Sequence, residues 1–421
     1  MLLGWRTALD CDRAGGTNMA KMAKIILRKN KTDAVKRFHP WIFSGAIKAI
    51  ADEVEEGDWV EVYSETGEYL ATGFYNSSNI AVKVLSFQPV PDLQALLLHK
   101  LQAAYDLRQR LGFLRHPEQL TNCYRLVNAE GDGLPGLIID WYDGVAVMQC
   151  YAIALYQQRE WLTDCLRKLY GDQLIAVYDK SAAVLPKSVP SENQYLWGQA
   201  EPRQVLEYGQ RFFVDWETGQ KTGFFLDQRE NRALLGRYVQ DQRVLNTFCY
   251  SGGFSVFAVQ AGASLVHSVD SSSRAIEWTH QNIALNSPTP NLPSTNQHEA
   301  FTEDVFDFLK RSQPQDYDVI VLDPPAFAKS LSARHSAMMA YKRLNRMAFE
   351  KVRSNGLIFT FSCSQVVGPD NFKGAVTAGA IEAGRSVQVL ATMTQPADHP
   401  VSLYHPEGLY LKGLILRVLD A

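Results

Sequence analysis

The feature that most constrains the fold is the alternation of helical and extended segments from about residue 226 to the C-terminus. Helical patterns cover "SRAIEWTHQNIALN" and the stretch from about 333 to 352, and apolar extended runs read "RVLNTF", "SLVHSVD", "YDVIVLD" and "GLIFTFS". Such alternation predicts a parallel, doubly wound α/β sheet. Ligands of these sheets bind beyond the carboxyl ends of the strands, so the residues after each run are the first candidates for a site.

The first three strand ends carry residues that suit a nucleoside. Cys249 to Gly253 form a loop of small residues after "RVLNTF", where glycines let the backbone approach a ligand closely. This loop lacks the GxGxxG spacing of a pyrophosphate site. Asp270 ends the next run, where an acid suits the two hydroxyls of a ribose. Asp304 follows the third strand and could accept from an adenine amino group, although an acid at such a place also caps helices.

The fourth strand ends in "VLDPPAFAKS", residues 321–330. Prolines lack a backbone N–H and cannot extend a central strand, so the run must stop at Asp323. The stretch therefore presents an acid and the aromatic ring of Phe327 beyond the strand end.

These four strand ends together resemble those of the class I S-adenosylmethionine-dependent methyltransferases. "DPPAF" resembles their [DN]PP[FYW] motif, whose polar residue and carbonyl groups hold the polar edge of a base while the ring stacks on it. The resemblance implies that Asp323, Pro324, Pro325 and Phe327 grip a planar nitrogenous base, with stacking worth roughly 1–3 kcal/mol.

Cys363 at the next strand end distinguishes the possible target atoms. A nitrogen has a lone pair and needs no nucleophile from the protein, whereas carbon 5 of a pyrimidine becomes nucleophilic only after a thiolate adds to carbon 6. Most protein cysteines are inert core residues, but the position of Cys363, at the end of "GLIFTFS", favours catalysis. Cys249 is the rival thiol, and its place in the predicted cofactor loop favours packing.

The segment "QKTGFFLDQRENR", residues 220–232, precedes the sheet. Its Gln228, Arg229 and Asn231 resemble the FxxxQxN-like segment with which pyrimidine-carbon methyltransferases reach over the methionine end of the cofactor. The alternative is an ordinary surface helix, because Asp227 with Glu230 also resembles a capping box.

The N-terminal half contains further domains, because 421 residues exceed one ordinary core. Short strands separated by glycine turns from 24 to about 92 predict a small β-barrel, and strands around a helix over 96–200 predict a compact middle domain. A hairpin is predicted around Tyr208-Gly209-Gln210. The first 21 residues lack the apolar centre of a secretory signal, and Met22 indicates an upstream start or a disordered tail.

Composition narrows the setting. No apolar run reaches the roughly 18 residues of a membrane span. The six cysteines form no CxxC pair, which suggests no metal site and a reducing cytoplasm. The net charge of −3 does not indicate nucleic-acid binding, but six Lys and Arg gather between Lys24 and Arg37. On charge alone, that run is more simply a solvated face.

From about Lys24 to its end, the chain is identified as a member of the large-subunit rRNA methyltransferase I family, which makes 5-methylcytosine in 23S rRNA. The motifs in family order are "RFHPWIFSGAI", "EGDGLPGLIID", "KTGFFLDQREN", "FCYSGGFSV", "LDPPAFAKS", "FSCS" and "ADHP…LYLKG". The resemblance implies an α/β class I Rossmann-like methyltransferase with an N-terminal PUA β-barrel and a small central α+β domain. The implied boundaries are an extension expected to be disordered (1–22), a PUA-like RNA-binding barrel (23–92), the central domain (96–200) and the methyltransferase domain (201–421).

The resemblance also implies roles for particular residues. Cys363 would be the nucleophile, and Asp323 would hydrogen-bond or protonate the ring nitrogen of a flipped cytosine. S-adenosylmethionine would be held by Gln228, Arg229, Asn246, Phe248, Tyr250, Ser251, Gly252, Asp270 and Asp304. The basic run becomes an expected RNA-phosphate contact through Lys29, Lys31, Lys36 and Arg37. The expected partner is 23S rRNA or a large-subunit assembly intermediate, with no membrane and with homodimerisation left open.

Two departures separate the chain from other enzyme groups. Other RNA 5-methylcytosine enzymes carry a cysteine directly after the diproline, where this chain has Ala326. Related guanine-N7 methyltransferases lack a cysteine in the "FS" motif. Action on uridine carbon 5, a guanine nitrogen or tRNA stays open, as does a non-catalytic role in ribosome assembly. The nucleotide methylated and the group that removes the carbon-5 proton are not determined.

Overall fold

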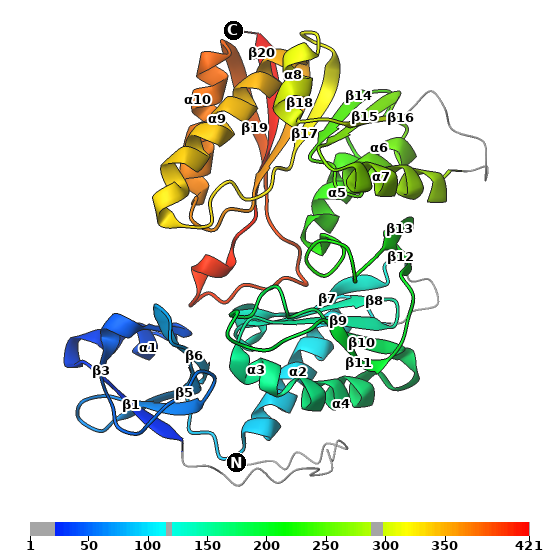
Figure 1. Cartoon of the computed structure of the whole chain (residues 1–421). Coiled ribbons are helices and arrows are strands. Elements are labelled where there is room, and N and C mark those ends of the chain that lie inside the picture. Colours follow the sequence, from blue (N-terminus) through cyan, green and yellow to red (C-terminus); the bar gives the residue numbers. More distant parts are fainter. Residues whose placement is uncertain (1–21, 115–119, 288–297, 421) are drawn as a thin grey trace.

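A computed structural model describes residues 22–114, 120–287 and 298–420 (Figure 1). The predicted N-terminal extension, apart from Met22, lies outside the described residues. The N-terminal unit is one sheet in the order β2-β6-β5-β4-β1-β3, with the short helix α1 (Asp33–Lys36) before β2. Its strands are β1 (Ala23–Leu27), β2 (Trp41–Phe43), β3 (Ile47–Ile50), β4 (Trp59–Tyr63), β5 (Tyr69–Tyr75) and β6 (Ile80–Ser86). Its core consists of buried side chains at alternating strand positions, such as those of Ile25, Val60 and Val82.

The central unit packs helices on a five-stranded sheet in the order β11-β10-β9-β8-β7. Its elements are α2 (Leu93–Arg110), β7 (Cys123–Asn128), β8 (Leu137–Tyr142), β9 (Val145–Cys150), α3 (Ile153–Gln157), α4 (Arg159–Tyr170), β10 (Ala176–Asp179) and β11 (Gln194–Gly198). Trp141 of β8 stacks on Tyr170 of α4, with ring centroids 3.9 Å apart. Strand β11 was not among the strands predicted from the sequence.

A hairpin links this unit to the C-terminal sheet. Strands β12 (Arg203–Glu207) and β13 (Gln210–Val214) pair antiparallel across a two-residue turn. Tyr208 (φ 48°) and Gly209 (φ 81°) both have positive φ, as a type I′ turn requires. The predicted hairpin is therefore present.

The C-terminal unit is a seven-stranded sheet in the order β16-β15-β14-β17-β18-β20-β19. Strands β14 to β18 are parallel, as predicted, whereas β20 runs antiparallel to both β18 and β19. The strands are β14 (Arg243–Thr247), β15 (Leu265–Asp270), β16 (His298–Thr302), β17 (Tyr317–Leu322), β18 (Val352–Ser362), β19 (Arg385–Met393) and β20 (Lys412–Asp420). The strand order reverses between β14 and β17, which is where a ligand site is expected in such a sheet.

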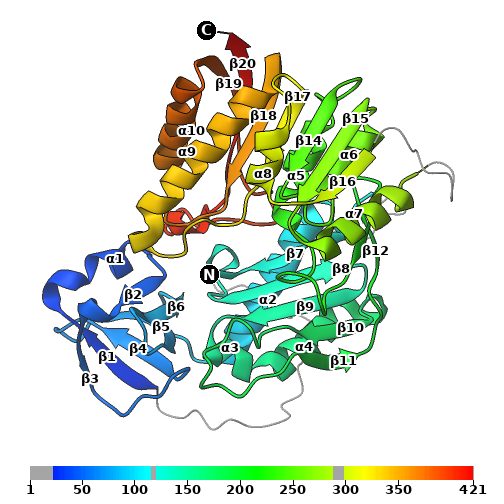
Figure 2. The same ribbon diagram turned by 45° about the horizontal axis from the view of Figure 1, so that its top comes forward.

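Helices cover both faces of this sheet (Figures 1 and 2). The helices are α5 (Arg229–Leu235), α6 (Gly253–Gln260), α7 (Ser273–Leu285), α8 (Val305–Arg311), α9 (Arg334–Lys351) and α10 (Pro369–Glu382). Phe308, Leu344 and Val376 of α8, α9 and α10 share one core with Ile320 and Ile358. Leu235, Phe254 and Ala258 of α5 and α6 share another core with Val319, Val321 and Phe359. Burial on both faces explains the near-continuous apolar strands.

The connection between β19 and β20, residues 394–411, is called the junction loop here. It leaves the sheet and reaches the space between the N-terminal and central units (Figure 1). Its Asp398 is fully buried and accepts from the Arg229 guanidinium (2.7 Å) and from the Arg125 backbone N–H (3.0 Å). Its Tyr404 packs against Phe38 of the N-terminal unit, with ring centroids 5.3 Å apart. The junction loop therefore joins all three units.

Candidate active site

Asp323 and Cys363 lie beyond the ends of the neighbouring parallel strands β17 and β18. The pairing of Leu322 with Thr360 brings these two strand ends together. The Cys363 Sγ lies 3.9 Å from the carbonyl oxygen of Pro324, and Cys363 is the one cysteine in the described part of the chain that is not buried. Pro324 of the diproline and Cys363, which are 39 positions apart in the sequence, therefore lie together at one candidate site.

The electrostatics of this site keep both groups protonated more readily than in water. Burial, and secondarily the charge of Asp227, raises the pKa of Asp323 to about 7, while the Gln228 amide, which donates to its Oδ1 at 2.9 Å, opposes the shift. Burial and the nearby carboxylates raise the pKa of the Cys363 thiol to about 12, and Lys412 opposes that rise. Asp323 can therefore donate a proton near neutrality, and Cys363 requires help to ionise.

Tyr410, near the end of the junction loop, and Lys412, the first residue of β20, complete the wall of the site. Lys412 pairs with Ser362 in the antiparallel β18–β20 register, and its ammonium donates to the Ser364 carbonyl at 2.7 Å. Burial lowers the pKa of Lys412 to about 8. The sequence motif "LYLKG" contained these residues, but no role was predicted for them.

The predicted capping box at Asp227 and Glu230 is wrong. Helix α5 begins at Arg229, and no side chain caps it. The Asp227 carboxylate instead accepts from the Tyr410 hydroxyl at 2.7 Å, and Glu230 accepts from the hydroxyl of Tyr208. The local sequence pattern predicted that the Asp227 carboxylate caps the helix. In the structure it binds Tyr410, which is 183 positions away in the sequence, so Asp227 lies at the candidate site.

The predicted cofactor loop folds against Asp270 at the end of β15. The Asp270 carboxylate accepts from the backbone N–H groups of Tyr250 (3.0 Å) and Ser272 (2.9 Å). Tyr250 and Gly252 have positive φ, and a Cβ on Gly252 would lie 2.8 Å from the Thr279 side chain, so glycine is needed there. The carboxylate keeps lone pairs that suit two ribose hydroxyls.

Of the other predicted cofactor residues, Phe248 and Ser251 lie in the cofactor loop, whereas Asn246 and Asp304 make hydrogen bonds within the protein. Phe248 is half-buried and Ser251 is buried in the same loop as Tyr250. The Asn246 amide of β14 donates instead to Ser255 of α6, at 2.8 Å, although its Oδ1 is buried without a hydrogen-bond partner. Asp304 is the N-cap of α8, accepting from the N–H groups of Phe306 and Asp307. This capping was the simpler of the two predicted roles for Asp304.

Arg229 and Gln228 lie near the site but already have protein partners. The Arg229 guanidinium is fully buried in its ion pair with Asp398 and lies over the ring of Phe113, 4.4 Å from its centroid. Gln228 is buried, donates to Asp323 and accepts from Asn231 at 2.6 Å. The structure thus places Arg229 in the joint with the central unit and Gln228 beneath the carboxylate of Asp323.

The surroundings of the predicted base-stacking residues are partly open. Pro325 is exposed, Pro324 is buried, and Phe327 is half-buried against Tyr341, with ring centroids 4.8 Å apart. The Tyr341 hydroxyl shares a hydrogen bond of 3.0 Å with Ser364, which ties this loop to the end of β18.

The predicted RNA contacts lie in the N-terminal unit around α1. Lys29, Lys31, Lys36 and Arg37 are all exposed. Lys36 is paired with Glu68 at 2.7 Å, so its charge is already partly neutralised within the protein.

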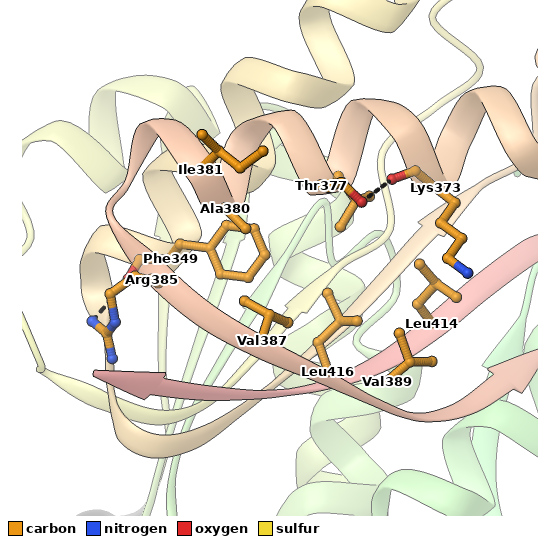
Figure 3. Close-up of a pocket in the computed structure, with 11 residues that line it drawn as sticks. Phe349, Lys373, Thr377, Ala380, Ile381, Arg385, Val387, Val389, Leu414 and Leu416 are labelled. Atoms are coloured by element: carbon orange, nitrogen blue, oxygen red, sulfur yellow. Dashed lines mark hydrogen bonds between the residues drawn. The ribbon is translucent and has the colours of Figure 1, made fainter. Parts of the chain in front are cut away.

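A separate apolar groove lies between α10 and the strands β19 and β20 (Figure 3). Ile381, Val387 and Val389 are among its lining residues, and Thr377 donates to the Lys373 carbonyl along its edge. None of the predicted site residues lines it. In the described residues, no helix has the length and apolarity of a membrane span, and no metal-suited group of three His, Cys, Asp or Glu side chains occurs.

Comparison with protein families gives two matches. Residues 25–87 match a PUA-like domain, and residues 125–412 match an S-adenosylmethionine-dependent methyltransferase. The second match runs across the central and C-terminal units, so the boundary predicted near residue 200 stays a prediction.

Individual relatives agree with these matches. Proteins named ribosomal RNA large subunit methyltransferase I from Escherichia coli (strain SMS-3-5 / SECEC) and Shigella boydii serotype 4 are each 36% identical over 404 residues, covering 94% of this chain and 99% of theirs. The crystal structure of the methyltransferase SMU.776 complexed with SAH is 26% identical with a TM-score of 0.80, over 94% of this chain and 100% of that chain. An S-adenosylmethionine-dependent methyltransferase from Streptococcus mutans has a TM-score of 0.79 at 26% identity, with the same coverage.

Proposed function

Because the chain belongs to the S-adenosylmethionine-dependent ribosomal RNA large subunit methyltransferase I family, we propose that it forms 5-methylcytosine in 23S rRNA. The observation that carries the proposal is that the Cys363 thiol, which is not fully buried, lies beside the "DPPAF" loop. A thiol at the base site is required for a carbon target and has no use for a nitrogen target. The rRNA substrate is inferred from the name of the relatives, and with it we expect a cytoplasmic location.

The proposed reaction begins when the target cytosine is flipped out of the RNA into the site, where Phe327 and the prolines contact its faces. The Cys363 thiolate adds to carbon 6 while Asp323, protonated near neutrality, donates to ring nitrogen 3. The charge of Lys412 favours the thiolate. The resulting enamine carries the electron pair on carbon 5.

The residues at the β14 and β15 ends fit the cofactor. Asp270 would hold the ribose hydroxyls, and the loop of Phe248, Tyr250 and Gly252 would surround the adenosyl group. When bound, S-adenosylmethionine supplies a methyl group whose bond to sulfur breaks as the bond to carbon 5 forms. Asp304 and Arg229 are assigned instead to capping and to domain packing, because their polar groups already have those partners.

A covalent trap tests the carbon-5 mechanism. In 23S rRNA transcripts made with 5-fluorocytidine, the fluorine at carbon 5 cannot leave as a proton does. The enzyme with S-adenosylmethionine should form a protein–RNA complex that survives denaturing electrophoresis. Cys363→Ala should abolish the complex.

Cys249→Ala is the matched control. Its Sγ is buried 3.6 Å from the Thr279 hydroxyl, so the substitution should leave the complex in place. Loss of the complex in Cys249→Ala and its persistence in Cys363→Ala would reverse the assignment. No complex with any variant, together with a methylated uridine or guanine in nucleoside mass spectrometry, would exclude cytosine carbon 5.

A further inference from the structure

A set of linked contacts surrounds the Cys363 thiol and the Asp323 carboxyl group. Gln228 donates to Asp323, Pro324 touches the Cys363 sulfur, and Lys412 donates to Ser364, the next residue after Cys363. Tyr410, two residues before Lys412, donates to Asp227, which directly precedes Gln228. Asp227 is therefore part of the same wall as the two groups already given roles.

The two carboxylate oxygens of Asp227 have different surroundings. Oδ2 accepts from Tyr410, whereas Oδ1 is buried and has no hydrogen-bond partner. A buried carboxylate oxygen without a hydrogen-bond partner costs free energy. Such an oxygen is therefore expected at a place where a bound ligand supplies the missing partner. The charge of Asp227 also acts on both Asp323 and Cys363, which places it within electrostatic reach of each.

The proposed reaction still needs a base. After methylation, carbon 5 bears both the methyl group and its original hydrogen, and that hydrogen must leave as a proton before the enzyme is released. Asp323 is engaged at ring nitrogen 3, and Lys412 has no lone pair while charged. Resting on the proposed function, we propose that the Asp227 carboxylate, held by the Tyr410 hydroxyl, takes the carbon-5 proton.

The step balances without any further reagent. Asp227 Oδ1 forms a bond to the proton, and the electrons of the carbon–hydrogen bond form the carbon 5–carbon 6 double bond. The carbon 6–sulfur bond breaks and leaves the Cys363 thiolate, while the proton on nitrogen 3 returns to Asp323. Methylated cytosine is released, and Asp227 loses its proton to solvent.

Asp227→Asn tests the assignment, because it keeps the shape and the bond from Tyr410 but removes the base. Addition and methyl transfer should continue, whereas release should slow by roughly 10²- to 10⁴-fold, the usual contribution of a general base. With 23S rRNA transcripts of ordinary cytidine and S-adenosylmethionine, Asp227→Asn should accumulate a protein–RNA complex stable to denaturing electrophoresis. The double variant Asp227→Asn with Cys363→Ala should show none.

Glu230→Gln is the matched control, since Glu230 is an exposed acid of the same segment bonded to Tyr208. It should release product as the unchanged enzyme does. Tyr410→Phe should accumulate the complex to an intermediate extent, because Asp227 remains but loses its anchor. Equal slowing of complex formation and release in Asp227→Asn, with no accumulation, would assign Asp227 a structural role only. Failure of the unchanged enzyme to trap 5-fluorocytidine RNA would instead refute the proposed function itself.

Discussion

At the residue scale, the proposed chemistry depends on Asp323 and Cys363, whose pKa values are both raised above their usual values by burial. The pKa of Asp323 is about 7 and that of Cys363 about 12. The proposed reaction needs the Cys363 thiolate together with the Asp323 carboxylic acid, and this combination of protonation states is a minor form of the enzyme. The fraction of enzyme in this form rises with pH as long as Asp323 stays protonated. Above the pKa of Asp323 the fraction is constant, because the gain in Cys363 thiolate with rising pH equals the loss of protonated Asp323.

The trapping reaction should therefore depend on pH. The rate of complex formation on 5-fluorocytidine RNA should rise about tenfold per pH unit below pH 7 and level off above it. In Asp323→Asn, the rate of complex formation should be lower by roughly 10²- to 10⁴-fold. This rate should keep rising with pH above pH 7, because the variant has no acid at this position that could ionise. Rapid mixing between pH 5.5 and 9 measures these rates.

Gln228→Leu serves as the companion variant. The Gln228 amide donates to Asp323 and lowers its pKa, so its removal should move the break in the profile above pH 7. A break that stays in place in Gln228→Leu, or that survives in Asp323→Asn, would contradict the role given to Asp323.

At the scale of elements, the junction loop is held by one buried carboxylate. Asp398 accepts from Arg229 and from the backbone of Arg125, its own carbonyl accepts from Arg108 at 2.7 Å, and His399 lies 3.0 Å from its Oδ1. The neighbouring His399 and Arg229 hold the pKa of Asp398 well below its usual range despite burial. The loop that carries Tyr410 into the site is therefore fixed by contacts with the central unit and with α5.

Asp398→Ala should leave the Arg229 charge buried and unpaired. Breaking such a pair typically costs about 3–5 kcal/mol, so urea unfolding should show a loss of this order. The depressed pKa means that this stabilisation is present above about pH 4 and is lost as the pH falls, so Asp398→Ala should lose less stability than the unchanged protein on acidification. Glu407→Gln, at a half-exposed pair with His39, should change stability by less than about 1 kcal/mol. Equal stability of Asp398→Ala and the unchanged protein would show that the joint does not depend on this ion pair.

At the scale of the whole molecule, the N-terminal unit is expected to bind RNA phosphates apart from the chemistry. Removing one cationic side chain that binds a phosphate reduces the slope of log affinity against log salt by about 0.7 to 0.9. Replacing Lys29, Lys31 and Arg37 with Gln in the full chain should weaken rRNA binding and flatten this slope, and should leave S-adenosylmethionine affinity unchanged by calorimetry. Lys36→Gln is the control, and its effect should be smaller because Lys36 is paired with Glu68. An unaltered salt slope in the triple variant would place the RNA-binding residues elsewhere.

The class of fold and the placement of the candidate site residues at strand ends could be predicted from the amino-acid sequence alone. Hydrophobic periodicity and turn residues can be recognised in short stretches of sequence. Such stretches were sufficient to predict the parallel strands β14 to β18, the hairpin at Tyr208-Gly209 and the positions of Asp270, Asp323 and Cys363. Strand β20 could not be placed in the same way, because its antiparallel pairing with β19 follows a connection of 18 residues, 394–411, and not a short hairpin turn.

Which side chains meet depends on the folded arrangement of the three units. Asp227 and Glu230 fit a capping box in sequence, yet Tyr410 binds Asp227 from 183 positions away. Arg229 fitted a cofactor segment, yet Asp398 takes its guanidinium at 2.7 Å. The physical reason is that buried polar groups must be satisfied by whatever the fold brings near, and the junction loop brings Asp398 and Tyr410 to the segment that contains Asp227 and Arg229.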